Sequence, residues 1–395
     1  MQHRKLTDLQ VMAIHNATTT APTYNLATGY PQYTLARQPD VATVVDDCLH
    51  NRVVQVEAEA RFRQAFFTLA GQPTAAHINR TLFCPAASFA LDIVANYLRL
   101  HTMSASLIEP TFDSLADILK RHRVPLHAVT ESELLQRGID DWLRLVTTDA
   151  LVLVTPNNPT GHMLSPADWH AIIDWCATTG TMLIVDCCFR FFDDTQCSWD
   201  QYALLEASGI RYIMIEDTGK TWPTGGLKVS AMSADQQTFT GLQTVYRDLL
   251  IALSTINLCV VTAYIETMTS EDLNTTVRRL SIRNRQIVRA TLVDSWLQPT
   301  ATQGSLEWAR IMTTVTDEAL VQHLQQFGIF LLPGRAFFWS RPSSNTRFLR
   351  IALMRDEEMV TRAMQRLTQV LPLQPRTPYR RIPTAWGVDQ TAVAA

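Results

Sequence analysis

Five short apolar runs, separated by helical stretches, leave few folds open to this chain. The runs lie at residues 105–109, 150–155, 181–186, 211–217 and 227–233. The segments between them, such as SLADILKRHR and SPADWHAIIDWCATTG, have the apolar spacing of helices. Strands of this length alternating with helices predict βαβ units and a mostly parallel, buried sheet. We therefore expect an α/β fold whose ligands bind beyond the carboxyl ends of the strands.

The pattern changes toward both ends of the chain. Residues 1–50 are irregular and rich in Thr, Pro and Ala, which indicates an arm or lid rather than a core element. Beyond about residue 290, a strand–helix–strand pattern predicts a smaller α+β unit. We interpret residues 51–290 as a large domain, 291–375 as a small C-terminal domain and 376–395 as a loose tail.

Composition excludes several classes of protein. With 47% hydrophobic and 18% charged residues, the chain can bury a large core, and its net charge of −3 gives no reason to expect nucleic-acid binding. The longest uncharged stretch, residues 249–265, is short and contains Ser, Thr and Asn, so we predict a buried helix rather than a membrane span. Seven cysteines without CxxC spacing and no apolar leader predict reduced thiols in a cytoplasmic protein without a metal site.

Lysine is scarce, because the chain has thirty arginines but only four lysines, which are Lys5, Lys120, Lys220 and Lys228. Arginine cannot replace lysine as a Schiff-base nucleophile, since its guanidinium group stays charged. Although most lysines are solvated surface groups, Lys220 follows a strand end within EDTGKTWPTGGLK. Lys228 lies eight residues later, after a glycine pair that permits close backbone approach. The sequence thus favours Lys220 as a nucleophile and Lys228 as a counter-charge for phosphate.

Two polar segments follow neighbouring strands of the predicted sheet. TPNNPTG, residues 155–161, would serve as a turn in any protein, but its asparagines can also donate hydrogen bonds to a ligand oxygen. Asp186 ends a wholly apolar strand, where a lone acid is usually a cap or a surface charge. If it is buried, it stays ionised only beside a partner such as a protonated heterocyclic nitrogen.

Two further segments add a phosphate site and a ring. In PAASFALD, residues 85–92, backbone N–H groups at Ala86 and Ala87 and the hydroxyl of Ser88 form a phosphate cup at a helix start. A serine there is also an ordinary helix cap. Phe112 follows a strand end, where its ring either packs in the core or stacks on a flat cofactor.

With these motifs in this order, residues 50–360 resemble the fold-type-I pyridoxal-phosphate enzymes, the aspartate aminotransferase superfamily. The resemblance implies a homodimer in which Lys220 forms the internal aldimine with pyridoxal phosphate and moves the α-proton. It implies that Asp186 keeps the pyridinium nitrogen protonated. It also implies that Arg350 pairs with the substrate carboxylate. The remaining cofactor contacts fall to Ala86, Ala87, Ser88, Phe112, Asn158, Cys188, Thr218 and Lys228.

Three departures from ordinary aminotransferases are similar to one subgroup, the arginine oxidases of enduracididine-type antibiotic pathways. Phe189 stands where a tyrosine is usual, Lys228 where an arginine is usual, and Asp217 where a serine is usual. The shared segments include EAEARFRQAFFTLAGQ, PTFDSLAD and IEDTGKTWPTGGLK. This likeness implies that Asp217 faces the substrate guanidinium and that an N-terminal arm closes the site. In that arm, Gln10 and Tyr30 replace a glutamate and a histidine, and both are predicted to contact substrate.

The resemblance therefore predicts oxidation of free L-arginine or a close analogue by O2, through a quinonoid intermediate, in specialised metabolism. Three alternatives stay open on the sequence. The first is a class I/II aminotransferase that uses a 2-oxo acid. The second is a pyridoxal-phosphate cyclase or lyase that acts on a hydroxylated arginine. The third is a binding protein that has kept the fold without the cofactor, against which the retention of Lys220 argues.

Overall fold

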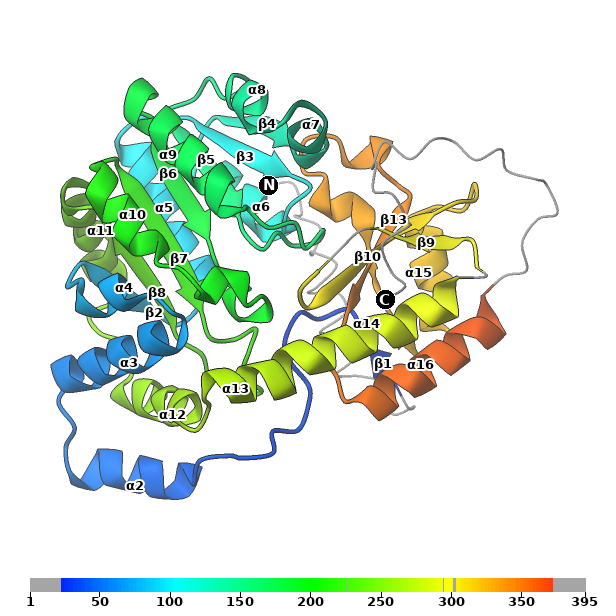
Figure 1. Cartoon of the computed structure of the whole chain (residues 1–395), viewed down its shortest axis with the longest axis horizontal. Coiled ribbons are helices and arrows are strands. Elements are labelled where there is room, and N and C mark those ends of the chain that lie inside the picture. The colour runs from blue at the N-terminus through cyan, green and yellow to red at the C-terminus, as the bar shows by residue number, and fades with distance from the viewer. Residues whose placement is uncertain (1–22, 225, 294, 301–302, 372–395) are drawn as a thin grey trace.

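The computed structural model describes residues 23–224, 226–293, 295–300 and 303–371. Within them, a seven-stranded sheet forms the centre of the larger unit, in the order β2-β8-β7-β6-β5-β3-β4 (Figure 1). Its strands are β2 (Thr81–Cys84), β3 (Ala105–Glu109), β4 (Leu126–Thr130), β5 (Ala150–Val154), β6 (Met182–Asp186), β7 (Tyr212–Asp217) and β8 (Ser230–Ala234). Only β8 runs antiparallel to its neighbours, so the expected α/β fold with a mostly parallel sheet is confirmed.

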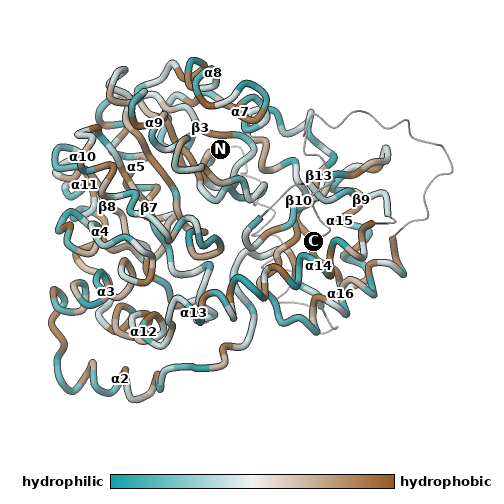
Figure 2. The backbone as a smooth tube through the Cα atoms, viewed as in Figure 1, coloured by the Kyte–Doolittle hydropathy of each residue, from teal (hydrophilic) through white to brown (hydrophobic). Residues whose placement is uncertain are grey.

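Helices cover both faces of this sheet, and its strands are drawn mostly in the brown of apolar residues in Figure 2. The covering helices include α5 (Ala87–Leu100), α6 (Asp113–Arg121), α9 (Pro166–Thr179), α10 (Gln201–Ser208) and α11 (Gln236–Leu249). Because both faces are covered, β3, β5 and most of β6 are buried continuously rather than alternately. The sequence pattern does not reveal β4, which is an edge strand with exposed residues at its centre.

The other helices of the larger unit lie around its edges. They are α2 (Val41–His50), α3 (Gln55–Leu69), α4 (Pro73–His77), α7 (Glu131–Arg137), α8 (Ile139–Leu143), α12 (Thr255–Glu266) and α13 (Ser270–Asp272). The apolar stretch at 249–265 is not the single helix that we expected. The chain leaves α11 after Leu249 and starts α12 at Thr255, because the Ser254 hydroxyl caps the new helix by accepting from Asn257. None of the helices in the described ranges is long and apolar enough to cross a membrane.

A smaller unit follows, with its own apolar core. Its antiparallel sheet has the order β12-β13-β10-β9 and is packed against helices α14, α15 and α16. The elements are β9 (Leu297–Pro299), β10 (Leu306–Ile311), β12 (Leu332–Pro333), β13 (Phe348–Ala352), α14 (Arg279–Leu292), α15 (Asp317–Gln325) and α16 (Glu357–Val370). Helix α14 runs from the larger unit into the smaller one and crosses the predicted boundary at residue 290 (Figure 1). The domain boundaries stay a prediction.

The described part of the predicted arm joins the smaller unit before it reaches the larger one. Strand β1 (Tyr24–Asn25) pairs in parallel with β11 (Ile329–Phe330), and Leu26 is fully buried in the smaller core. The amide of Gln32 then donates to the carbonyl of Met354. These contacts direct residues 27–30 across the gap between the units. Residues 1–22 of the arm, which include Gln10, and the predicted tail lie outside the described residues.

Candidate active site

A cavity of about 610 Å³ opens beyond the carboxyl ends of β5, β6 and β7. Its volume suits a small-molecule site, and its position is the one expected for an open α/β sheet. The predicted residues that line it are Tyr30, Ala86, Ala87, Ser88, Phe112, Asn158, Asp186, Cys188, Asp217, Lys220, Lys228 and Arg350. Thr218 is not part of the lining. The fold therefore brings together nearly all the side chains that were chosen from sequence.

The amines of both lysines lie close to the ring of Tyr30. The Nζ atom of Lys220 is 4.7 Å from the centre of the tyrosine ring, and that of Lys228 is 4.8 Å from it. Lys228 also donates a hydrogen bond of 2.8 Å to the Tyr30 hydroxyl. Burial acts to raise the pKa of Tyr30, but the bond from Lys228 and the charges of both lysines outweigh it and lower this pKa. The phenol is thus held within a strongly cationic part of the cavity.

Asp186 ends β6 on the cavity wall, where its carboxylate accepts a 2.9 Å hydrogen bond from the amide of Cys188. Burial raises the pKa of Asp186, and the nearby charge of Asp217 raises it further, whereas Lys220 acts in the opposite direction. A carboxylate in this position is costly to ionise without a cation beside it. Its chemistry therefore suits a ligand that brings a protonated ring nitrogen.

Asp186→Asn is expected to stabilise the cofactor-free protein at pH 8 by about 1–3 kcal/mol, because it removes a poorly solvated charge. Since the folded state raises the pKa of Asp186, the penalty is absent below its ordinary value of 3.8 and grows as pH rises toward the folded value. Urea unfolding at pH 4 and pH 8 measures this. Asp174→Asn, on the exposed face of α9, is the control. A stability difference that does not change with pH would contradict the assignment.

Helix α5 presents its N-terminus to the cavity, and an oxyanion already lies on it. The amide of Ala87 donates a 3.0 Å hydrogen bond to the carboxylate of Asp217, which also accepts from Gly219 at 2.6 Å. A Cβ atom on Gly219 would lie 2.9 Å from both Asp217 Oδ1 and Lys228 Cδ, so a larger residue there would displace these two side chains. The exposed Ser88 adds a hydroxyl to this helix start. Together these groups fit a phosphate.

Thr218 lies beside these residues but points elsewhere. Its hydroxyl donates to the Val229 carbonyl at 3.1 Å and accepts from the Val229 amide at 2.9 Å. These bonds hold the loop that carries Lys220 against Val229, the residue after Lys228. A phosphate contact from Thr218 stays a prediction.

Arg350 lies at the opposite wall on β13 and is only 1% exposed. Its Nη1 donates to Asn158 Oδ1 at 3.1 Å, and its Nη2 donates to the carbonyl of Ala27. Burial lowers the pKa of Arg350 to about 9, with the neighbouring charge of Arg355 acting in the same direction and Asp113 opposing it. Its Nε has no hydrogen-bond partner among the described residues. A buried cation with a spare donor on a cavity wall is suited to bind a carboxylate.

The sequence reasoning missed the contribution of α6 to the cavity. Ser114, Asp117 and Arg121 line it, and Asp113 lies near enough to Arg350 to influence its charge. Residues 113, 117 and 121 recur every four positions, which places them on one helix face. That spacing was the available signal. The helix adds the carboxylate of Asp117 to a cavity that already contains Asp186 and Asp217.

Glu131 was also missed, and it holds the asparagine turn in place. Its fully buried carboxylate accepts 2.7 Å hydrogen bonds from Asn157 Nδ2 and from the Thr160 hydroxyl. Burial raises the pKa of Glu131, while His162 and these hydrogen bonds lower it. No sequence signal marks this residue, because it lies about 25 positions before the turn that it supports.

Comparisons with known proteins agree with this geometry. Residues 50–367 match the family model for class I and II aminotransferases. The structure of MppP soaked with its product 2-ketoarginine is similar, with a TM-score of 0.78 and 29% identity, over 87% of this chain and 99% of that one. Aspartate aminotransferase from Thermus thermophilus with maleate has a TM-score of 0.74 at 14% identity, over 93% and 97% of the two chains, and supports the fold alone.

Among curated proteins, histidinol-phosphate aminotransferase 2 from Caulobacter vibrioides is 26% identical over 183 residues. The match spans 46% of this chain and 46% of that relative, so less than half of the relative's length is covered.

Proposed function

This chain belongs to the class I and II aminotransferase family, and from that premise we propose that it oxidises free L-arginine or a close analogue with O2. The family uses pyridoxal phosphate, and the residues present fit this cofactor. Lys220 would hold it as a Schiff base, Asp186 would pair with its ring nitrogen, and α5 with Lys228 would hold its phosphate. Phe112 and Asn158 would contact the ring. When bound, the cofactor supplies an electron sink for bonds at the substrate's α-carbon.

The observation that carries the arginine proposal is the likeness to MppP, which extends over 99% of that chain and concerns a structure with 2-ketoarginine. That molecule has a carboxylate at one end and a guanidinium group at the other. The cavity of this chain has a group of opposite charge for the carboxylate end and another for the guanidinium end. Arg350 has a buried guanidinium with a spare donor, and Asp217 has a buried carboxylate near Lys220.

Each residue then has a separate task. Arg350 binds the substrate carboxylate. Asp217 accepts hydrogen bonds from the guanidinium group, either after it leaves the amide at the start of α5 or while it keeps that contact. The Lys220 amine, once released, takes the α-proton. Phe189 lines the cavity where relatives carry a tyrosine, so this side chain supplies no hydroxyl donor. We propose that this difference permits electrons to pass to O2.

Oxygen uptake with purified enzyme tests the proposal. We expect L-arginine to drive O2 consumption, with peroxide or water as the reduced product, and L-citrulline, its neutral isostere, to react at least about tenfold more slowly, a difference of 1.4 kcal/mol. Asp217→Asn should reduce that ratio, because it removes the charge that favours a cation. Asp174→Asn should leave the ratio unchanged. If arginine binds and reacts without consuming oxygen, the oxidase proposal is wrong.

The same assay separates the competing functions. A plain aminotransferase, which family membership and the Caulobacter relative favour, would transfer the amino group to a 2-oxo acid without O2. A cyclase or lyase would turn over a hydroxylated arginine under anaerobic conditions. A protein without cofactor would lack visible absorption. The homodimer, the cytoplasmic location and a role in antibiotic biosynthesis stay predictions.

A further inference from the structure

A buried ion pair lies directly behind the cavity wall, between Arg190 and Glu216. The two side chains are 2% and 1% exposed. Arg190 Nε donates to both carboxylate oxygens of Glu216, at 2.9 and 3.1 Å, and its Nη2 donates at 2.5 Å. We propose that this pair positions the cofactor site by fixing Asp186 relative to Lys220. The inference rests on family membership and not on the proposed substrate.

The pair connects the two segments of chain that carry the reacting groups. Arg190 begins the short 3₁₀ turn η1 (Arg190–Phe192), four residues after Asp186. Glu216 is the penultimate residue of β7, four residues before Lys220. Because side chains alternate along a strand, Asp217 faces the cavity and Glu216 faces away from it. Neither member of the pair lines the cavity, although Phe189, just before Arg190, and Asp217, just after Glu216, both do.

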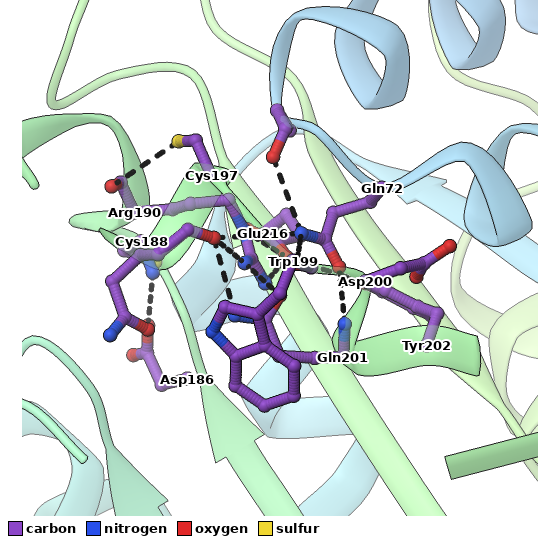
Figure 3. A network of polar contacts seen from close by, with 12 residues as sticks. Gln72, Asp186, Cys188, Arg190, Cys197, Trp199, Asp200, Gln201, Tyr202 and Glu216 are labelled. Atoms are coloured by element: carbon purple, nitrogen blue, oxygen red, sulfur yellow. Dashed lines mark hydrogen bonds and ion pairs between the residues drawn. The ribbon is translucent and has the colours of Figure 1, made fainter. Parts of the chain in front are cut away.

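A polar network ties this pair to the rest of the larger unit (Figure 3). Arg190 Nη1 donates to the Gln196 carbonyl at 3.0 Å and to Gln201 Oε1 at 2.7 Å. The backbone N–H of Gln201 donates to Gln72 Oε1 at 2.9 Å, and Gln72 Nε2 donates to the Trp199 carbonyl at 2.8 Å. The guanidinium therefore bonds to acceptors on several sides. Such a group has one orientation, and so does the turn that carries it.

The energetics favour a positioning role over a purely stabilising one. Removing two charges from water is costly, and apolar side chains of similar volume often stabilise a core equally well. Burial raises the pKa of Glu216, whereas the charge and hydrogen bonds of Arg190 act to lower it. What apolar residues cannot reproduce is the planar, two-point geometry of the pair. Reacting groups must be held to about 0.5 Å, and this pair spans the segments that carry two of them.

The test compares variants that keep the fold but lose the two-point contact between Arg190 and Glu216. Arg190→Met with Glu216→Leu replaces both charges by apolar side chains, so neither is left uncompensated. We expect a similar or higher melting temperature, but pyridoxal-phosphate binding weaker by about 10- to 100-fold, the range seen when second-layer partners of metal ligands are removed. We also expect the pH midpoint of the visible band formed with Lys220 to move by about one unit, equivalent to tenfold in the proton equilibrium.

Arg80→Met with Glu206→Leu is the matched control, because this pair also has a 2.5 Å contact but neither residue lies within four positions of Asp186 or Lys220. If the first double variant does not fold, Arg190→Lys takes its place, because it keeps the charge and loses the two-point bond. For this variant we expect a smaller loss of pyridoxal-phosphate affinity and a smaller shift of the pH midpoint. A folded Arg190/Glu216 double variant, or Arg190→Lys in its place, with the wild-type affinity and pH midpoint would overturn the proposal.

Discussion

Lys220→Arg is expected to abolish the visible absorption of the bound cofactor and to lower kcat by at least about 10²- to 10⁴-fold, the share usually supplied by a positioned acid–base group. The substitution keeps a positive charge 4.7 Å or so from the Tyr30 ring, where Lys220 Nζ lies. Arginine, however, stays protonated and can form no Schiff base. The variant therefore separates the effect of losing the nucleophilic amine from the effect of losing a positive charge. Absorption spectra and single-turnover rates measure the two effects.

Lys120→Arg is the matched control, with the same substitution elsewhere in the chain. The Lys120 amine donates to the carbonyl of Trp339 at 2.9 Å and lies 5.0 Å from the centre of its ring. Arginine can make both contacts. We expect unchanged spectra and rates. Retention of the visible band in Lys220→Arg would show that another amine holds the cofactor, and Lys228 would be the first candidate.

The residues chosen from the sequence lie close together because parallel strands end at one edge of the sheet. Asp186 and Lys220 follow β6 and β7, which are adjacent, and Asn158 follows β5, the next strand along. Local patterns that identify strands therefore also identify neighbours across the sheet. The helix start at Ala87 was predictable from local sequence, since small residues and a serine are typical of a helix N-terminus that binds phosphate.

What the sequence could not predict are contacts between segments far apart in the chain. Tyr30 contacts Lys228 across 198 positions, and residues 25–30 accept four hydrogen bonds from Arg355, which no local pattern predicts. Arg190 is a similar case. Most arginines were expected on the surface, and the few that are buried depend on partners in other elements. Such contacts arise from the assembled fold rather than from periodicity.

Arg350→Lys is expected to lower kcat/KM for the amino-acid substrate by about 30- to 4,000-fold, the equivalent of 2–5 kcal/mol for a buried, hydrogen-bonded charge pair at a binding site. Lysine keeps the charge but loses the planar fork that binds a carboxylate at two points. Because Arg350 is buried and also holds Asn158, part of the loss should appear in kcat. Steady-state kinetics with arginine measures both quantities.

Agmatine, which is arginine without its carboxylate, separates substrate binding from general damage to the site. If Arg350 binds the carboxylate, wild-type enzyme should bind agmatine more weakly than arginine, and Arg350→Lys should bind the two with similar affinity. If the residue only supports the wall through Asn158 and Ala27, both ligands should lose affinity equally. Arg341→Lys, at an exposed position, should change neither. Equal losses would remove Arg350 from substrate binding and leave the proposed cofactor contacts intact.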